Sequence, residues 1–418
     1  MTSILSCFTP KKTHSINLLL FFSMLTFTVN AQNNKIDSLK GLAFKSLPDT
    51  NRVNLYYVIC REYLRISSDS ALKAGRQSLA LAKKLNYSKG IAKAYNIIGI
   101  INYRKADYPQ AIEYYKKSKA IHESINNQLG ISQVYNNLGV VSKKRGNLTQ
   151  ALEYYQKSLK IQQRLKNQKI IAQTNNNLGT IHLQMENYPL ALKYFKKALT
   201  LKEKLNTSAG SLVLASNNIS IVLTKMGRYQ EGNIYSKNAL SICLKAGLTQ
   251  SMATVYNQLG EIKAFQNQID SAIFYQKKAI DKASQTKYTT LHIRSLCSLA
   301  NIYLKQKKYD QAQQEAEKAL QLAQTTKELA AVRDAAEVLY QSAAQQQDYA
   351  QAFKYQTLYL QSKDSLFNAD KAKEMTQLEM NYAFDKKQAL IKASQKAKEE
   401  KIKIENDKKL QKQQFYLL

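Results

Sequence analysis

The sequence is poor in the residues that interrupt helices. Its 418 residues include only 4 prolines and 13 glycines, and tryptophan is absent. Proline and glycine are the least favourable residues in a helix interior, so their scarcity beside abundant Ala, Leu, Lys and Gln predicts an all-α protein with short turns. The length exceeds what a single hydrophobic core usually supports, which indicates several domains or a repeat array.

Cysteine and acidic residues are also scarce. Cys60, Cys243 and Cys297 are far apart and stand among apolar residues in helical patterns, so we expect buried thiols rather than a disulfide framework. Basic residues outnumber acidic ones 62 to 30, which gives a formal charge of +32 spread along almost every expected helix. This charge attracts anionic surfaces but carries no sign of base-specific recognition, and nucleic acid is not the partner we expect.

The N-terminus has the pattern of a secretory signal peptide. Lys11 and Lys12 precede the apolar run INLLLFFSMLTFTV, and small residues lead to Ala31. The run is shorter than a comfortable membrane span, so an uncleaved anchor is the less favoured alternative. Cys7 precedes the apolar run and therefore cannot be a lipoprotein anchor. We predict removal of residues 1–31 and export to a periplasmic or extracytoplasmic location.

Small residues recur with a period of 40 or 41 residues. One set closes phrases such as NNLG and consists of Gly99, Gly139, Gly179, Ser220, Gly260 and Ala300. A second set follows twelve residues later and consists of Ala111, Ala151, Ala191, Gly232, Ala272 and Ala312. A third follows after seven more and consists of Ser118, Ser158, Ala198, Ala239, Ala279 and Ala319. Helices approach closely only where the facing side chains are small, so the three sets predict repeated helix–helix crossings.

Each unit has the pattern of a helical hairpin. Val134, Leu138 and Val141 share one face of a first helix, and Tyr155 lies with two small residues on one face of a second helix. Gly146 suits a left-handed helix end, and the pairs Tyr108-Pro109 and Tyr188-Pro189 suit the first turn of second helices. A single hairpin cannot bury both of its apolar faces, whereas a stack of hairpins can.

These residues resemble the tetratricopeptide repeat, with a period longer than the 34 residues usual in that family. The pattern is similar to the long-helix variety of kinesin light chains and spindle-orientation adaptors. The resemblance implies a right-handed superhelical solenoid of about eight helix pairs within residues 32–362, clearest over 88–325. The first unit lacks the NLG phrase, and Tyr340 and Tyr359 replace small residues in the last unit, as expected of terminal caps.

The chain changes character near its C-terminal end. Residues 363–413 contain neither glycine nor proline and become almost entirely Lys, Glu, Gln and Asp. This composition predicts one long charged helix, a weak coiled coil that would also support a homodimer, with a disordered tail as the alternative. Residues 414–418 end in FYLL and resemble the beginning of an apolar membrane segment.

No motif indicates catalysis or a cofactor. His122, His182 and His292 lie in different repeats without a partner at helical spacing, so we predict no metal site and interpret them as surface or groove residues. The sequence contains no phosphate-binding glycine loop, nucleophile elbow or kinase signature. We therefore expect neither an enzyme nor a bound cofactor.

Asparagine recurs in register with the glycines. The first row lies three residues before each small residue and consists of Asn96, Asn136, Asn176, Asn217 and Asn257. The second row follows directly and consists of Asn137, Asn177 and Asn218, with Gln258 continuing it. The resemblance implies that both rows face the concave groove, where an amide offers two donors and one acceptor to the backbone of an extended peptide. Alternatively, the second row satisfies backbone groups between repeats.

Basic residues close to these rows suggest which peptides would bind. Lys93, Arg104, Lys143 and Lys144 lie on or near the turns and would favour acidic segments or a C-terminal carboxylate. The predicted groove therefore comprises both asparagine rows with Lys93, Arg104 and Lys143, and its predicted ligand is a protein or peptide.

Two functions fit these features. The exported repeats, the charged helix and the terminal apolar residues together resemble the extracytoplasmic part of membrane-anchored sensor kinases and regulators of Bacteroidetes-type bacteria. That resemblance implies a sensory region, associated with the membrane through its C-terminal end, in a chain truncated before its output domain. The alternative is a free periplasmic or secreted scaffold that holds partner proteins.

Overall fold

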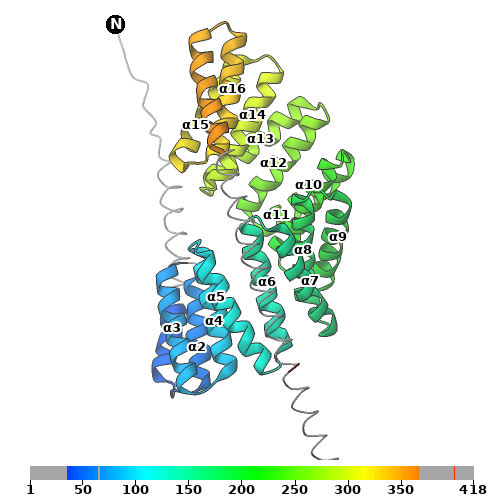
Figure 1. The fold of residues 1–418 in the computed structure, drawn as a ribbon. Coiled ribbons are helices and arrows are strands. Elements are labelled where there is room, and N and C mark those ends of the chain that lie inside the picture. Colours follow the sequence, from blue (N-terminus) through cyan, green and yellow to red (C-terminus); the bar gives the residue numbers. More distant parts are fainter. Residues whose placement is uncertain (1–34, 65, 367–399, 401–418) are drawn as a thin grey trace, which may run out of the picture. The chain divides into compact units, whose positions relative to one another are not determined.

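The computed structural model describes residues 35–64, 66–366 and 400, and the secondary structure in these ranges is helical with no strand (Figure 1). A short helix spans residues 35–45. It is followed by α2 (Thr50–Tyr63), α3 (Ser68–Lys84), α4 (Ser88–Arg104), α5 (Tyr108–Ser124), α6 (Gln128–Lys144), α7 (Leu148–Arg164), α8 (Gln168–Gln184), α9 (Tyr188–Lys204), α10 (Ala209–Lys225), α11 (Tyr229–Ala246), α12 (Thr249–Phe265), α13 (Ile269–Gln285), α14 (Thr289–Lys305), α15 (Tyr309–Thr326) and α16 (Leu329–Gln345). A last helix spans 349–366.

Some predicted segments lie outside the described residues. These are the signal peptide at 1–31, the terminal residues 414–418, and the charged segment from 367 to 413 apart from residue 400. The helix at 349–366 crosses the predicted boundary between residues 362 and 363.

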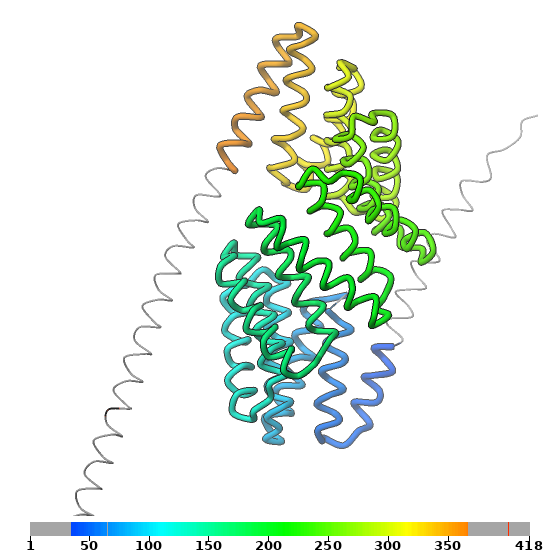
Figure 2. The backbone as a smooth tube through the Cα atoms, turned by 90° about the vertical axis from the view of Figure 1, so that its right-hand side faces the viewer, coloured from blue at the N-terminus to red at the C-terminus, as the bar shows by residue number. Residues whose placement is uncertain are grey.

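The helices form antiparallel hairpins, as the tube in Figure 2 shows. Each even-numbered helix, the first helix of a pair, is followed by a second helix that packs against it. From α4 onward the first helices begin at residues 88, 128, 168, 209, 249, 289 and 329. The described residues therefore build an all-α solenoid of tetratricopeptide type, and the predicted fold class is confirmed.

The described part of the chain divides into two compact units between residues 174 and 175, and this boundary lies within α8. In the first unit, α4 contacts α2 and α6 as well as its own partner α5. In the second unit, α10, α12, α14 and α16 contact one another in succession. Within each unit the first helices thus form a continuous layer. We call the side of this layer turned away from the second helices the inner face.

The three sets of small residues lie at the helix crossings. The alanines at positions 111, 151, 191, 272 and 312 are completely buried, as are Ser118, Ser158 and the alanines at 198, 239, 279 and 319. Ser118 donates a hydrogen bond to the carbonyl of Ala92 at 2.8 Å, and Ser158 donates to that of Ser132 at the same distance. The small residues therefore allow close packing, and the serines also satisfy backbone carbonyls of the first helices.

Glycine in a first helix creates space for an aromatic ring in the second. A Cβ added to Gly99 would lie 2.6 Å from the Tyr115 ring, and one added to Gly139 would lie 2.6 Å from the Tyr155 ring. Tyr155 is completely buried, as is Phe195 beside Gly179 in the second unit. Further along the second unit this pairing changes, because Gly260 faces Gln276 and Ser220 donates to or accepts from Ser236 at 2.7 Å.

The turns depend on left-handed residues. Gly146 has a φ of 85° as predicted, but most of the turn residues with positive φ are not glycine. They include Ala106 (φ 60°), Lys166 (φ 53°) and Glu186 (φ 56°). Tyr108 and Tyr188 begin α5 and α9 with proline in the first turn, as predicted, and Asn147 caps α7 by accepting from the Gln150 amide at 2.9 Å.

Candidate functional site

The two predicted rows lie on the first helices, where their members are half-buried or buried, while Arg104 at the end of α4 is exposed. Asn136, Asn217 and Asn257 of the first row are 7%, 5% and 5% exposed, and Asn96 and Asn176 are half-buried. In the second row Asn137, Asn177 and Asn218 are half-buried, and Gln258 is buried. The rows therefore lie at the contacts between first helices and reach the inner face only in part.

The two rows bind each other across neighbouring repeats. In the first unit, Asn137 of α6 donates from Nδ2 to Oδ1 of Asn96 on α4 at 2.9 Å. In the second unit, Asn218 of α10 donates in the same way to Asn176 on α8 at 3.2 Å. Part of the hydrogen-bonding capacity of the amides thus holds successive first helices together. Each of these amides keeps a further donor or lone pair for a ligand.

The pairing changes between α10 and α12. Gln258 occupies the second-row position on α12, but its longer side chain donates to Oγ1 of Thr224 at 2.9 Å. The Oδ1 atom of Asn217 is consequently buried without a hydrogen-bond partner. One helix further on, Asn257 accepts from Ser295 at 3.1 Å and donates to Glu261 at 2.8 Å.

Glu261 is a residue that the sequence reasoning missed. It lies on α12 one turn after Asn257, and desolvation raises the pKa of its carboxyl group. The hydrogen bond from Asn257 and the charges of Arg294 and Lys225 act in the opposite direction. In the described part of the chain Glu261 forms no ion pair. One sequence feature could have indicated this residue. Glu261 is a carboxylate four residues after a first-row asparagine, a position where other repeats have Ile100, Val140 or Thr180.

The predicted basic residues have different surroundings. Lys93 on α4 is half-buried above the Tyr57 ring, and burial together with Lys89 lowers its pKa. Burial and Lys144 lower the pKa of Lys143 on α6. The Arg104 guanidinium donates to the Leu64 carbonyl at the end of α2, so it supports the packing of α4 on α2. Since α4 and α6 contain no acidic residue, all the side-chain charges that these two helices contribute are positive.

The interpretation of the histidines as surface or groove residues is wrong for two of them. His122 is only 4% exposed, because Gly130 leaves space for its ring: a Cβ there would lie 2.4 Å from the imidazole. His182 is 8% exposed and stacks on Tyr194 with ring centroids 5.3 Å apart. Burial is the main cause that lowers the pKa of both imidazoles. His292 remains half-buried.

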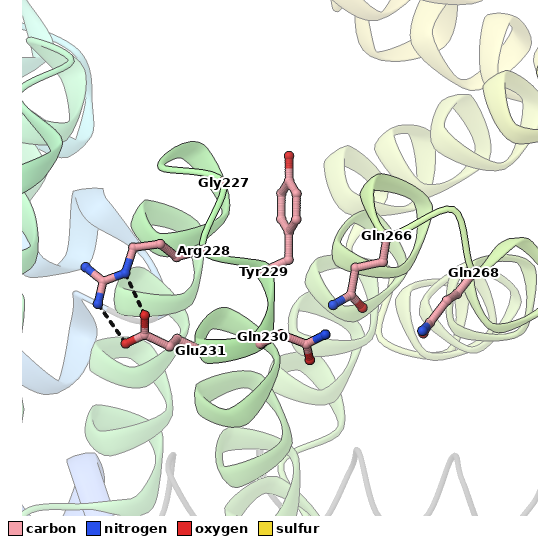
Figure 3. A pocket seen from close by; sticks show the side chains of 7 residues that line it. All are labelled: Gly227, Arg228, Tyr229, Gln230, Glu231, Gln266 and Gln268. Carbon is pink, nitrogen blue, oxygen red and sulfur yellow. Dashed lines mark hydrogen bonds and ion pairs between the residues drawn. The ribbon is translucent and has the colours of Figure 1, made fainter.

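Two cavities lie away from the asparagine rows. One lies at the turns that follow α10 and α12, and Figure 3 shows Tyr229 and Gln266 among its lining residues. There Arg228 and Glu231 point toward each other, and the Arg228 Nε lies 2.6 Å from the Glu231 carboxylate. The other lies beside helix 35–45, with Ile59 and Ala74 among its apolar lining residues. Neither cavity contains the combination of nucleophile, base and orienting group that a catalytic site requires.

The described residues contain no group of three or more His, Cys, Asp or Glu side chains that could hold a metal ion. They also contain no helix long and apolar enough to span a membrane. Cys60, Cys243 and Cys297 are free and buried, as predicted, and burial raises the pKa of each thiol.

Comparisons with known proteins support the repeat interpretation. Models of the tetratricopeptide repeat match residues 130–204, 211–285 and 293–326. The chain therefore contains tetratricopeptide repeats. No protein of curated function matches the sequence significantly.

Several solved structures have a similar fold. Aspartyl phosphate phosphatase F from Bacillus subtilis matches with a TM-score of 0.56 and 13% identity, over 87% of this chain and 96% of that chain. A Rap protein complexed with competence and sporulation factor matches with a TM-score of 0.52 and 13% identity, over 76% and 99% of the two chains. A signal transduction ATPase with a tetratricopeptide repeat sensor from Pyrococcus horikoshii gives 0.60 and 16%, over 83% and 54%. At these identities the similarity establishes the fold alone.

Proposed function

We propose that this protein is a non-enzymatic interaction module that binds an acidic, extended segment of a protein partner on the inner face of α4 and α6. Repeat solenoids of this type present long surfaces to other proteins. The Rap protein that shares the fold was captured with competence and sporulation factor. The positive inner face of the first unit gives the proposal its chemical direction.

The observation that carries the proposal is that neither Lys93 nor Lys143 has an ion-pair partner among the described residues. Each is half-buried beside another lysine, and the pKa of each is lowered by burial and by that neighbouring charge. A carboxylate of the ligand would offset the repulsion between each lysine and its neighbouring lysine. It would also compensate for the hydration that each ammonium group loses on burial. Amides of both asparagine rows lie on the same helices and can bind a peptide backbone.

We further propose that this module is exported and is the sensory part of a membrane-linked signalling system. The support is the signal-peptide pattern at residues 1–31 and the tetratricopeptide sensor of the Pyrococcus protein. Sequencing of the genomic DNA beyond codon 418 tests the signalling role. An apolar stretch of about twenty codons followed by signalling motifs is expected, and a stop codon among genes of an assembly pathway would favour the scaffold instead.

Charge reversal tests the binding proposal. The Lys93→Glu/Lys143→Glu double variant should bind acidic peptides, selected from a random library on the unchanged protein, at least about tenfold more weakly. The matched control is Lys84→Glu/Lys160→Glu, which makes the same charge change at exposed positions on the second helices α3 and α7. Equal losses in both double variants would indicate long-range attraction alone and contradict a site on the inner face.

A further inference from the structure

The inner face of the second unit differs from the repeat pattern at the contact between α10 and α12. Asn217 is only 5% exposed, yet its Oδ1 has no hydrogen-bond partner among the described residues. At the corresponding contacts, Asn96 and Asn176 each accept from a second-row asparagine. A buried acceptor without a donor is costly, so its retention here requires an explanation.

A second acceptor lies on the neighbouring helix. The Glu261 carboxylate accepts one hydrogen bond, from Asn257 at 2.8 Å, and in the described residues it is not ion-paired. Lys225 on α10 and Arg294 on α14 influence its charge without coming within ion-pair distance. A carboxylate offers about four acceptor positions, so most of the capacity of Glu261 remains available.

An exposed apolar side chain lies close to one of the acceptors. Leu214 lies one turn before Asn217 on α10 and is 52% exposed, although it belongs to a first helix. Apolar surface beside buried acceptors is the composition of a site for a side chain with an aliphatic stem and a cationic end.

We propose that the inner face of α10 and α12 is a subsite for a lysine or arginine side chain of a peptide bound to the second unit, with Glu261 accepting the cationic group and Asn217 accepting a peptide N–H. This proposal rests on the proposed peptide-binding function and adds a second, opposite charge preference to it. Asn217 can present its oxygen by a half-turn of its terminal amide, because that torsion is soft. A lysine stem can lie along apolar surface of the inner face while its ammonium group reaches Glu261.

Physical chemistry favours a cation here over any other group. A partly desolvated carboxylate without an ion pair gains from a positive partner that brings its own donors. Arginine or lysine also supplies several N–H donors, which suits a site with acceptors in excess. An acidic side chain would instead face Glu261 directly and be repelled.

The test uses the full chain and a random dodecapeptide library displayed on phage. Peptides retained by the unchanged protein should be enriched several-fold in Lys or Arg at one aligned position. The Glu261→Gln variant should retain peptides without that enrichment. Glu315→Gln, which removes a carboxylate on the second helix α15, should preserve it.

A double-mutant cycle with one retained peptide then measures the interaction between its basic residue and Glu261. Replacing its basic residue with glutamine should weaken binding to the unchanged protein about tenfold, which corresponds to a charged hydrogen bond, and should have little effect on the Glu261→Gln variant. Arg294→Ala, which removes a competing cation, should strengthen binding of the basic peptide. Asn217→Leu should weaken all retained peptides without lowering the melting temperature.

The outcomes separate this subsite from the proposed function. Retained peptides with equal enrichment in the unchanged protein and in Glu261→Gln, or a cycle without coupling, would overturn the subsite and leave peptide binding intact. A library from which the unchanged protein retains no peptide would overturn both.

Discussion

The inner faces of the two units differ, although both units are built from the same kind of repeated helical hairpin. In the first unit α4 and α6 contribute Lys93, Lys143 and other basic residues with no acidic one, and the carboxylate of Glu62 on α2 is ion-paired with Lys35 at 2.8 Å. In the second unit the first helices also carry carboxylates, namely Glu261 on α12 and Asp334 and Glu337 on α16. Glu337 stands at the first-row asparagine position. The repeat therefore fixes where side chains lie, while single substitutions at those places determine the charge offered to a partner.

The core differs between the units as well. In the first unit, tyrosine rings fill the space above Gly99 and Gly139. In the second unit Phe195 fills this space beside Gly179, but Gly260 faces Gln276, and Ala300 and Ala316 are both buried alanines. The first unit thus relies more on large buried rings at this position, and its stability should be more sensitive to their loss.

The largest expected effect tests this difference in the core. Tyr155→Ala should lower the free energy of unfolding by about 3–5 kcal/mol, because a completely buried ring leaves a cavity beside Gly139. Gln276→Ala at the equivalent position should cost less than half as much, because it removes less apolar volume than a tyrosine ring does, although the Nε2 donation to the Asn257 carbonyl at 3.3 Å is lost. Urea unfolding followed by circular dichroism measures both. Equal losses would show that the two cores depend equally on this position.

The asparagine rows allow a finer test. Asn96→Leu removes the acceptor of Asn137 Nδ2 and should lower the free energy of unfolding by about 1–3 kcal/mol. Asn217→Leu removes an amide whose oxygen has no partner and should leave stability unchanged or raise it slightly. Thermal unfolding of the two variants at the same pH gives the comparison. Destabilisation of equal size would mean that Asn217 has a structural partner in solution.

The smallest expected effect concerns pH. Burial, Lys93 and Lys89 lower the pKa of His122 below its ordinary value near 6.5. Below about pH 6.5 the imidazole therefore binds a proton more readily in the unfolded chain than in the folded unit. The free energy of unfolding is highest above this pH and falls as the pH decreases through it. His122→Gln, the residue found at the equivalent buried position 162, should reduce this fall. Melting temperatures between pH 7.5 and 5 measure it. An unchanged pH dependence would assign the effect to other groups such as His182 or His292.

The sequence predicts the helices, their pairing and the small residues at the crossings because those features repeat. Ala151 and Ser158 are buried as expected, since a larger side chain at either position would separate two helices. The partners of individual polar side chains do not repeat in the same way. Gln258 is only one methylene longer than asparagine, yet it reaches Thr224 and leaves Asn217 without a donor. His122 is buried because of Gly130, a residue outside the repeated sets. Such contacts depend on side-chain length and on the opposite helix, which periodicity does not encode.

The turns have a practical consequence. Ala106 and Glu186 hold backbone conformations that cost L-residues roughly 1–2 kcal/mol, a cost that glycine avoids. Replacing either residue with glycine therefore offers a way to make the protein more heat-resistant without changing a side chain of the proposed contact surface. Such variants would form a series that differs in stability alone, against which a loss of partner affinity in other variants could be judged.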